Sequence, residues 1–305
     1  MKVKFSFDDF SEIALAENDT FAKHMKQVGQ NDDAYWFLDK GSSVLAVAHL
    51  DSVEQRKRWA RHVQLPHEHL VFSPVLDDRL GVYVICSLLP KLGIDTDILL
   101  TTGEEQGAST AMLFETEKQY NWMFQFDRSG TDVVMYQYDN ATTRQMMRDA
   151  GFRVGVGTFS DISVLGHLHC CGFNFGTAYY DYHSVNAFAR IGELMTNVRK
   201  FAGFYKRWNT TYIPYTDRLD ERFTLDDRRE YLDEMRTRYG IIDGTGFPDG
   251  YNYNHHMRCA DDDTEHEWIP ADCPNCGAQI MIDLAHPDGA SCYNCGLLVD
   301  EEELG

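Results

Sequence analysis

Four acidic groups in the first half of the chain each border a short apolar segment, and this arrangement constrains the fold most strongly. The groups are Asp51, Asp77-Asp78, Glu104-Glu105 and Asp127. Apolar runs of this length and aliphatic content are typical of buried strands. The carboxyl ends of parallel strands lie along one edge of an α/β sheet, where such folds bind ligands, so we expect the acids to converge there. Carboxylates gathered in this way predict a bound cation.

The first acidic group belongs to a His-x-Asp pattern, formed by His49 and Asp51. Residues two apart on an extended strand point the same way, so His49 can bind a metal through one ring nitrogen while Asp51 holds the ring by the other. The adjacent Glu104 and Glu105 cannot both point at one metal from an extended backbone. One of them can therefore be a ligand while its neighbour stays free to move protons.

Alternating strand-like and helix-like segments predict an α/β protein. Strands are expected at residues 34–38, 44–50, 69–75, 98–102, 122–127, 133–138 and 171–175. Helices are expected at residues 8–27, 79–92, 107–120, 140–150 and 185–209. The alternation favours a mainly parallel mixed sheet with helices on both faces.

The composition supports one large folded domain with a small appendage, since 43% of the 305 residues are hydrophobic. No stretch approaches the roughly 18 apolar residues of a membrane span, and the N-terminus reaches acidic residues before any signal-like run. We therefore expect a soluble cytoplasmic protein. The net charge of -20 argues against nucleic-acid and anionic-membrane binding, because phosphate contacts depend on Lys and Arg clusters.

Five short motifs follow one another in the first two thirds of the chain. They are His49-x-Asp51, Asp77-Asp78-Arg79-x-Gly81, Glu104-Glu105-x-Gly107, Asp127 and Tyr182-His183-Ser184. In this order they resemble the co-catalytic dizinc exopeptidases, the group of zinc aminopeptidases, aminoacylases and related carboxypeptidases. The resemblance covers about residues 1–209. Paired acids are common on surfaces, so each motif alone is weak, but five in this order are a strong signal.

The resemblance implies a set of metal ligands shared between two Zn²⁺ ions. Asp77 would bridge the ions, and the remaining ligands would be His49 and Asp127 at one site and Glu105 and His183 at the other. The family also suggests a cis peptide bond between Asp77 and Asp78.

Other residues receive roles from the same resemblance. Glu104 would be the general base, and Asp51 would act beside it as a second catalytic residue. Residues expected to contact the substrate are Asp161, Arg128 and Tyr182.

The chemistry of such a site is consistent with hydrolysis. Two divalent cations, three ligand carboxylates and one bridging hydroxide nearly cancel in charge, so the site is close to neutral when ready to attack. Two metals roughly 3.5–4 Å apart can polarise a carbonyl and lower the pKa of the shared water toward about 7. The reaction implied is hydrolysis of an amide bond. Zn²⁺ is the expected ion, with Co²⁺ or Mn²⁺ as alternatives.

Spacing predicts a single-domain, aminopeptidase-like fold. Only 55 residues separate Asp127 from His183, which leaves no room for the lid domain that some branches insert there. Only 25 residues separate Asp51 from Asp77, where another branch inserts a domain. The chain departs from the family pattern at Ala187, where many relatives have the Glu of a His-Ser-x-x-Glu motif.

Three functional hypotheses follow from these features. The first is a dizinc aminopeptidase-type exopeptidase that acts on peptides. The second is a hydrolase of N-acyl amino acids or other small amides, which would use the same metal chemistry. The third is a non-catalytic adaptor on a peptidase-like scaffold; Glu104 argues against it, whereas Ala187 leaves it open. The sequence does not predict the oligomeric state.

The composition changes after residue 209. Residues 211–305 hold 22 acids against 7 arginines and no lysine. We expect a catalytic domain at residues 1–209, a charged helical extension at 210–239, an acidic linker at 240–267 and a zinc ribbon at 268–305.

The ribbon is predicted by two C-x-x-C pairs with 15 residues between them, Cys273 with Cys276 and Cys292 with Cys295. Such pairs bind Zn²⁺ tetrahedrally in a reducing compartment, and disulfides fit poorly without a secretory signal. We therefore expect one structural Zn²⁺. The acidic surroundings of the ribbon favour a protein partner over nucleic acid.

Overall fold

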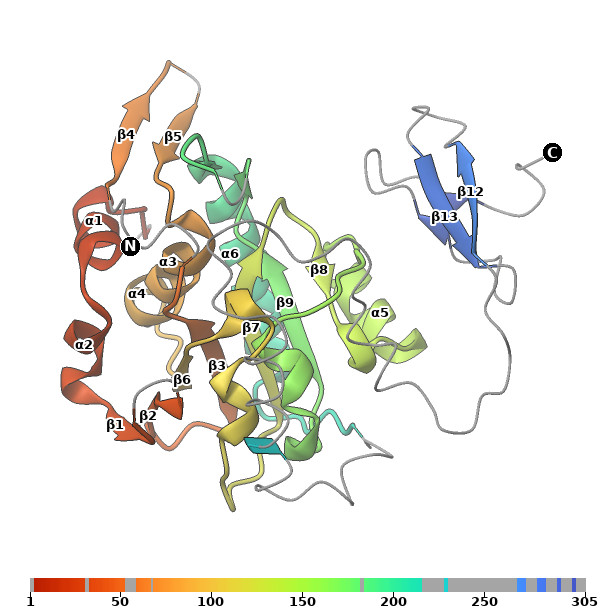
Figure 1. The fold of residues 1–305 in the computed structure, drawn as a ribbon, viewed down its shortest axis with the longest axis horizontal. Coiled ribbons are helices and arrows are strands. Elements are labelled where there is room, and N and C mark those ends of the chain that lie inside the picture. Colours follow the sequence, from red (N-terminus) through yellow and green to blue (C-terminus); the bar gives the residue numbers. More distant parts are fainter. Residues whose placement is uncertain are drawn as a thin grey trace. The chain divides into compact units, whose positions relative to one another are not determined.

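The structure is a computed structural model of the chain, shown in Figure 1. It describes residues 3–30, 33–52, 59–66, 68–181, 184–215, 228–229, 268–272, 279–283, 290–291 and 298–299. The chain divides into two compact units, residues 1–253 and 254–305. The boundary lies inside the segment 240–267, and the finer division of the chain stays a prediction.

The first unit is built on a seven-stranded sheet. Its strands, in order across the sheet, are β1 (Lys26–Val28), β2 (Tyr35–Leu38), β6 (Asp97–Thr101), β3 (Val44–His49), β7 (Trp122–Arg128), β9 (Gly172–Gly176) and β8 (Val133–Val134). The four strands β6, β3, β7 and β9 are parallel, and the pairings at both edges are antiparallel. The predicted α/β fold with a mainly parallel mixed sheet is confirmed.

Strand β3 lies at the centre of the sheet and decides where ligands can bind. All of its residues are buried, as are those of β6 and β9, which explains the continuous apolar runs in their sequences. Val47 of β3 lies opposite Leu99 of β6 on one side and Gln125 of β7 on the other. The chain thus passes from β3 to one neighbour and later to the other, and the crevice at such a switch point is the usual ligand site of this architecture.

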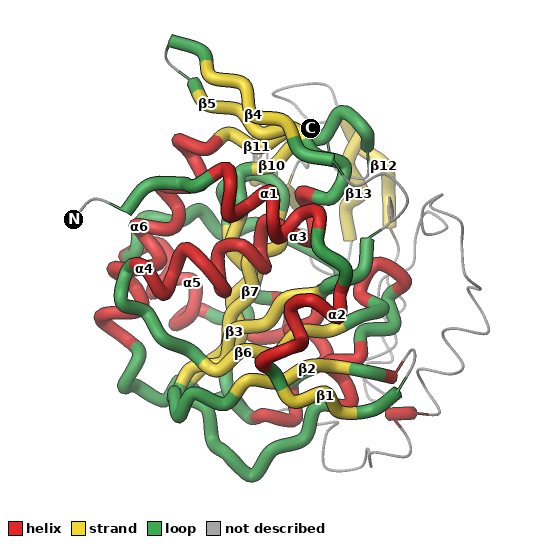
Figure 2. The backbone as a smooth tube through the Cα atoms, turned by 90° about the vertical axis from the view of Figure 1, so that its left-hand side faces the viewer, coloured by secondary structure: helices red, strands yellow, loops and turns green. Residues whose placement is uncertain are grey.

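Helices cover one face of the sheet, as Figure 2 shows. They are α1 (Phe7–Leu15), α3 (Leu76–Tyr83) with its continuations η3 (Val84–Leu88) and α4 (Leu89–Lys91), and α6 (Ile191–Trp208). The ring of Phe201 in α6 packs on Phe124 and Phe126 of β7, with centroids 4.5 and 5.1 Å apart. A Cβ at Gly81 would lie 2.1 Å from the Phe126 carbonyl oxygen, so only glycine lets α3 approach this strand so closely.

Short helices cover the opposite face. These are η5 (Thr110–Leu113), η7 (Asp161–Val164) and η8 (Gly166–Leu168). Gln125 lies between Phe124 and Phe126 on β7, so it points to this other face, where its side chain donates a hydrogen bond to Asp161. Other helices among the described residues of the unit are α2 (Asn18–Phe21), η1 (Ala22–His24), η4 (Glu104–Gln106), η6 (Tyr136–Tyr138) and α5 (Ala141–Asp149), the last capped by Asn140 as predicted.

A second, antiparallel sheet stands beside the first and is not predicted from the sequence. Its strands, in order, are β10 (Tyr179–Tyr180), β11 (Phe188–Arg190), β5 (His69–Phe72) and β4 (Arg61–Gln64). Strands β4 and β5 form the hairpin labelled in Figure 1.

Several predicted elements are wrong in part. The single helix predicted at 8–27 is three short helices, α1, α2 and η1, because the backbone at Ala16 is extended, and residues 26–27 belong to β1. The predicted helix at 107–120 is only the short helix η5, because Ala111 to Phe114 are all buried and consecutive burial does not suit a one-sided helix. The predicted strand at 133–138 ends after Val134, and Tyr136 takes a positive φ of 48°. The helix predicted from residue 185 begins at Ile191, because residues 188–190 pair with β5.

The second unit contains two short antiparallel pairs. Strand β12 (Trp268–Asp272) pairs with β13 (Gln279–Asp283), and β14 (Ala290–Ser291) pairs with β15 (Leu298–Val299). The four ribbon cysteines lie outside the described residues. Among the helices of the described ranges, none is long and apolar enough to cross a membrane.

Candidate metal centre

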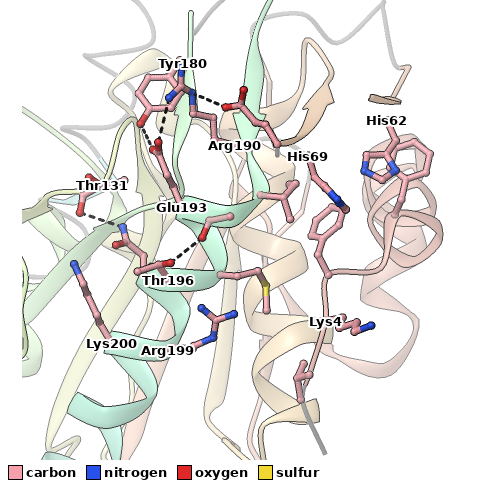
Figure 3. Close-up of a pocket in the computed structure, with 18 residues that line it drawn as sticks. Lys4, His62, His69, Thr131, Tyr180, Arg190, Glu193, Thr196, Arg199 and Lys200 are labelled. Atoms are coloured by element: carbon pink, nitrogen blue, oxygen red, sulfur yellow. Dashed lines mark hydrogen bonds and ion pairs between the residues drawn. The ribbon is translucent and has the colours of Figure 1, made fainter. Parts of the chain in front are cut away.

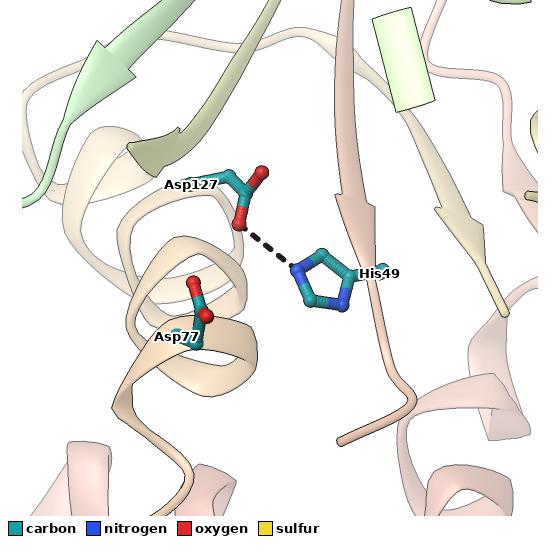
Figure 4. A group of neighbouring side chains, drawn as sticks. All are labelled: His49, Asp77 and Asp127. Carbon is teal, nitrogen blue, oxygen red and sulfur yellow. Dashed lines mark hydrogen bonds and ion pairs between the residues drawn. The ribbon is translucent and has the colours of Figure 1, made fainter. Parts of the chain in front are cut away.

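The carboxyl edge of the sheet brings five of the predicted site residues together. His49 ends β3, Glu104 and Glu105 follow β6, and Asp127 lies near the end of β7. Asp77 enters from the first turn of α3. Figure 4 shows His49, Asp77 and Asp127, whose ligand atoms lie within 4.8 Å of one another. The same limit holds for His49, Glu104 and Glu105.

The two glutamates lie on a tight turn between two glycines. Gly103 and Gly107 flank η4 with φ values of 79° and 64°, in the left-handed region that favours glycine. A Cβ at Gly103 would also lie 2.3 Å from the Ala108 carbonyl oxygen. The glycines therefore let the chain turn directly after β6 and bring both glutamates to the end of β3.

His49 is the centre of the cluster and is only 2% exposed. Its Nε2 lies 3.0 Å from Asp127 Oδ1. Its Nδ1 lies 3.7 Å from Asp51 Oδ1 and 3.6 Å from Asp78 Oδ1. Asp51 Oδ2 accepts a 3.2 Å hydrogen bond from the backbone N–H of Glu105, so Asp51 contacts both the ring and the turn.

Burial and crowding shift the pKa values in this cluster. Burial and the charge of Glu105 raise the pKa of Asp78 well above its usual value. Burial, with the charges of Asp127 and Glu105, does the same to the pKa of Glu104. Burial lowers the pKa of His49, but the charge of Asp127 and its neighbours outweighs burial and raises it well above the usual value. Such large pKa shifts are common where charged groups are held together for function.

Several buried polar atoms of the cluster have no hydrogen-bond partner among the described residues. They are both carboxylate oxygens of Asp78, Oδ1 of Asp51 and Nδ1 of His49. Buried polar atoms are rarely left without a partner, and a bound ion is a usual explanation. Carboxylates combined with imidazole form the donor set that Zn²⁺, Co²⁺ and Mn²⁺ accept in proteins. The residues present therefore fit divalent cations.

Two residues that the sequence analysis does not identify hold the acids in place. Tyr179 donates a hydrogen bond from its hydroxyl to Asp77 Oδ1. Asn174 accepts from the Asp127 backbone N–H at 3.1 Å and lies 3.4 Å from Asp127 Oδ2 through its amide nitrogen. Asn174 is the one polar side chain in the apolar run of β9, and this is the signal that could have found it.

The other predicted site residues fall in different places. His183 and Tyr182 lie outside the described residues. Arg128 is half-buried at the end of β7, and its guanidinium bonds with Asp132. Asp161 is completely buried, and its predicted contact with substrate stays a prediction.

The predicted cis peptide bond is also wrong. The described residues contain no cis peptide bond. Asp77 and Asp78 both lie in the first turn of α3, where helical geometry requires trans bonds.

A separate cavity of about 1180 Å³ opens elsewhere on this unit. Figure 3 shows it between the N-terminal segment, the β4–β5 hairpin and the start of α6. Its basic residues are Lys4, His62, His69, Arg190, Arg199 and Lys200. Arg190 bonds with both Glu68 and Glu193, so part of this charge is balanced. No described residue of the metal cluster lines the cavity.

Comparison with known proteins supports the fold. No known family model matches the sequence, and no curated protein matches it. The crystal structure of a tripeptidase from Staphylococcus aureus aligns with a TM-score of 0.51 and 9% identity, over 66% of this chain and 97% of that one. The chain therefore shares the fold of this tripeptidase.

Two further solved structures align over similar lengths. The aminopeptidase PepT from Bacillus cereus aligns with a TM-score of 0.48 and 10% identity, over 65% of this chain and 96% of that one. An aminopeptidase from the archaeon Desulfurococcus kamchatkensis aligns with a TM-score of 0.45 and 11% identity, over 68% and 98%.

Proposed function

We propose that the chain is a metal-dependent peptidase of the aminopeptidase type that binds two divalent cations at the carboxyl edge of its sheet. One observation carries the proposal: two groups of ligand atoms, each spanning no more than 4.8 Å, share His49. The fold of the tripeptidase from Staphylococcus aureus supports it.

The proposed ligand roles are those that the family resemblance implies, and the group of His49, Asp77 and Asp127 supports the first site. His49, Asp77 and Asp127 would hold one ion, and Asp77 would be shared with a second ion held by Glu105 and His183. Asp51 would orient the His49 ring, because it lies 3.7 Å from Nδ1. When bound, the ions would polarise the scissile carbonyl and acidify the attacking water.

Glu104 would move the protons of the reaction. It lies in the same tight group as His49 and Glu105 but has a neighbour that can serve as the ligand in its place. As general base it takes a proton from the attacking water, whose oxygen bonds to the carbonyl carbon. It then gives the proton to the amine nitrogen as the C–N bond breaks.

The test compares three single substitutions. Glu104→Gln should keep both metals but lower kcat by about 10²–10⁴-fold, the usual contribution of general acid-base catalysis. Asp77→Ala should lose metal as well as activity. Glu117→Gln, at an exposed acid outside the cluster, is the matched control and should behave as wild type. Equal metal loss in Glu104→Gln and Asp77→Ala would show that Glu104 is a ligand.

Substrate specificity needs a separate measurement. Aminoacyl, N-acyl and C-terminal reporter amides, assayed with added Zn²⁺, Co²⁺ or Mn²⁺, separate an aminopeptidase from an N-acyl amino acid hydrolase. We expect the free-amine substrates to react fastest. Preference for N-acyl substrates would favour an N-acyl amino acid hydrolase. No hydrolysis of any reporter would favour the non-catalytic adaptor.

The second unit is proposed to bind one structural Zn²⁺ through Cys273, Cys276, Cys292 and Cys295, and to offer a docking surface for a protein partner. The spacing of the cysteines supports the metal site. Metal analysis should give three ions per chain. A chain ending at Tyr253 should lose one of them and keep kcat/KM within a few-fold, since all five motifs lie before that residue. A hundredfold loss from a folded, two-metal chain would assign the ribbon to the active site.

A further inference from the structure

A buried carboxylate lies beneath the metal cluster and is not one of its proposed ligands. Asp161 starts η7 on the face of the sheet opposite α3 and α6, and its side chain is completely buried. Its Oδ1 accepts hydrogen bonds from the hydroxyls of Thr101, at 2.8 Å, and Ser109. Its Oδ2 accepts a 2.7 Å bond from the amide of Gln125. Hydrogen bonds to a charged acceptor are about twice as strong as neutral ones.

Two of the three donors lie on the strands on either side of β3, and the third, Ser109, is the N-cap of η5. Thr101 ends β6 and stands just before the turn that carries the two glutamates, and Ser109 stands just after that turn. Gln125 lies on β7, two residues before Asp127. One carboxylate therefore holds both ends of the glutamate turn and joins them to the strand that carries Asp127.

The glutamate turn depends on this support because its own backbone is permissive. Two glycines bound it, and glycine has the greatest conformational freedom of all residues. Other bonds join the ends of the turn to each other, among them Thr110 N–H to Thr102 O at 2.8 Å and Thr102 N–H to Thr110 Oγ1 at 3.0 Å. Asp51 accepts a bond from the Glu105 N–H, and the Thr102 and Thr110 hydroxyls donate to the Ala34 carbonyl at 3.3 Å. Asp161 adds a connection from both ends of the turn to β7.

We infer that Asp161 is a positioning residue that sets the distance between the glutamate turn and Asp127. The inference rests on the proposed function, since it concerns the geometry of the same metal centre. Without this carboxylate the turn moves relative to β7, so Glu105 binds its metal less well and Glu104 is misplaced for proton transfer. Loss of supporting contacts around metal ligands typically costs 10–100-fold in metal affinity or activity.

The test separates position from charge. Asp161→Ala removes all three bonds. Asp161→Asn keeps most of them: its oxygen can accept from Gln125, its NH₂ can donate to the hydroxyls, and Thr101 has an alternative acceptor in the Ala48 carbonyl at 3.3 Å. Thr101→Val, which removes one donor with little change of shape, keeps the test possible if Asp161→Ala does not fold.

The matched control lies at the other end of the same strand. Asp97 begins β6, is completely buried and accepts 2.9 Å bonds from the Lys40 and Ser42 backbone N–H groups and the Tyr120 hydroxyl. Asp97→Asn perturbs a comparable network far along the strand from the glutamate turn.

Three readouts are measured on the full chain: hydrogen exchange of the residue 103–109 amides without metal, Zn²⁺ affinity by competition with a chromophoric chelator, and kcat with KM. Asp161→Ala should speed exchange at least tenfold, weaken the lower-affinity Zn²⁺ by about 10–100-fold and lower kcat more than it changes KM. Thr101→Val should shift each readout in the same direction by less. Asp161→Asn and Asp97→Asn should keep wild-type exchange in the turn.

Two outcomes would overturn the inference. One is unchanged exchange and Zn²⁺ affinity in Asp161→Ala, or in Thr101→Val where the alanine variant does not fold. The other is Asp161→Asn as impaired as Asp161→Ala, which would assign the effect to charge. Both outcomes are independent of hydrolysis, so an inactive wild-type chain would refute the proposed function without deciding the role of Asp161.

Discussion

Buried carboxylates at the two ends of strand β6 have different surroundings. At the amino end, Asp97 meets two backbone N–H groups, the Tyr120 hydroxyl and the ammonium of Lys118. At the carboxyl end, the ion pairs of Asp51, Asp78 and Asp127 all run to the single imidazole of His49. At the first end one carboxylate has its own cationic partner, Lys118. At the second end three carboxylates form ion pairs with the same imidazole.

This difference separates a structural acid from a functional one. Burial lowers the pKa of Lys118, but its bonds with Asp97 and Asp39 outweigh burial and raise this pKa, so Lys118 favours its charged form. At the carboxyl end, burial and mutual repulsion raise the pKa of Asp78 and Glu104 instead. A cluster of buried like charges destabilises the folded state. Bound cations offset the repulsion between the carboxylates, so the same cluster is a good cation site.

The largest expected effect comes from removing that cation. A mild chelator should abolish hydrolysis while leaving the fold intact, since the core of the sheet does not depend on the cluster. Adding back Zn²⁺, Co²⁺ or Mn²⁺ should restore it. Activity, circular dichroism and bound metal are followed on the same sample. Hydrolysis that continues after both labile ions are gone would show that the carboxyl-end cluster is not a catalytic cation site.

Neutralising one acid at each end should change stability with opposite signs. In the metal-free protein at neutral pH, Asp97→Asn should destabilise the fold by about 1–3 kcal/mol, because buried donors lose their charged acceptor. Asp78→Asn should instead stabilise by about 1–2 kcal/mol, because it removes a buried charge among like charges. Urea unfolding measures both.

Excess Zn²⁺ provides the control for this pair. The gain in Asp78→Asn should shrink or reverse when Zn²⁺ is present, since ligands that bind the folded state add their binding free energy. A loss of stability in metal-free Asp78→Asn equal to that of Asp97→Asn would mean that both carboxylates are structural.

The central strands and the meeting of their acids could be predicted because both follow from local pattern. A buried parallel strand reads as an apolar run, and its carboxyl end is fixed by chain direction, so His49 and Asp127 could be placed at one edge. The short helix η5 could not be predicted, since four consecutive buried residues fit several structures.

Residues that act through contacts distant in the sequence could not be predicted from it. Tyr179 and Asp77 are 102 positions apart, and no periodicity connects them. Asp161 was assigned to substrate by resemblance, whereas its burial depends on three donors from other elements. Pairing with β5 likewise turns residues 188–190 into a strand at the start of a segment that reads as helix.

Two adjacent tyrosines offer a smaller comparison, because one contacts an acid of the metal cluster and the other contacts an acid outside it. Tyr179 donates its hydroxyl to Asp77 in the cluster, whereas Tyr180 donates to Glu193 near the start of α6. Tyr179→Phe should weaken Zn²⁺ binding about tenfold through loss of this supporting bond. Tyr180→Phe is the matched control and should leave the affinity unchanged. Equal affinities in the two variants would remove Tyr179 from the metal centre.

The smallest effect expected is a pH dependence that belongs to Asp161. Burial raises the pKa of Asp161 from its usual 3.8 to about 6, although bonds from Ser109 and Thr101 oppose the rise. Between these values the folded state holds a proton that the unfolded state has released, so the free energy of unfolding falls as pH rises. Below about pH 4 both states are protonated and the carboxyl costs nothing; above about pH 6 its full cost is present, at most about 3 kcal/mol.

Asp161→Asn removes this contribution together with the part of the rise in the Glu104 pKa that the Asp161 charge causes. The metal-free variant should match wild type near pH 4 and become the more stable of the two as pH rises to about 6, with a constant difference above. Urea unfolding at intervals from pH 4 to 8 measures it. The gain has no counterpart in Zn²⁺ affinity, because the asparagine keeps the bonds that fix the turn. A difference that grows toward acid would mean that Asp161 is stabilised as an anion and belongs with the structural acids.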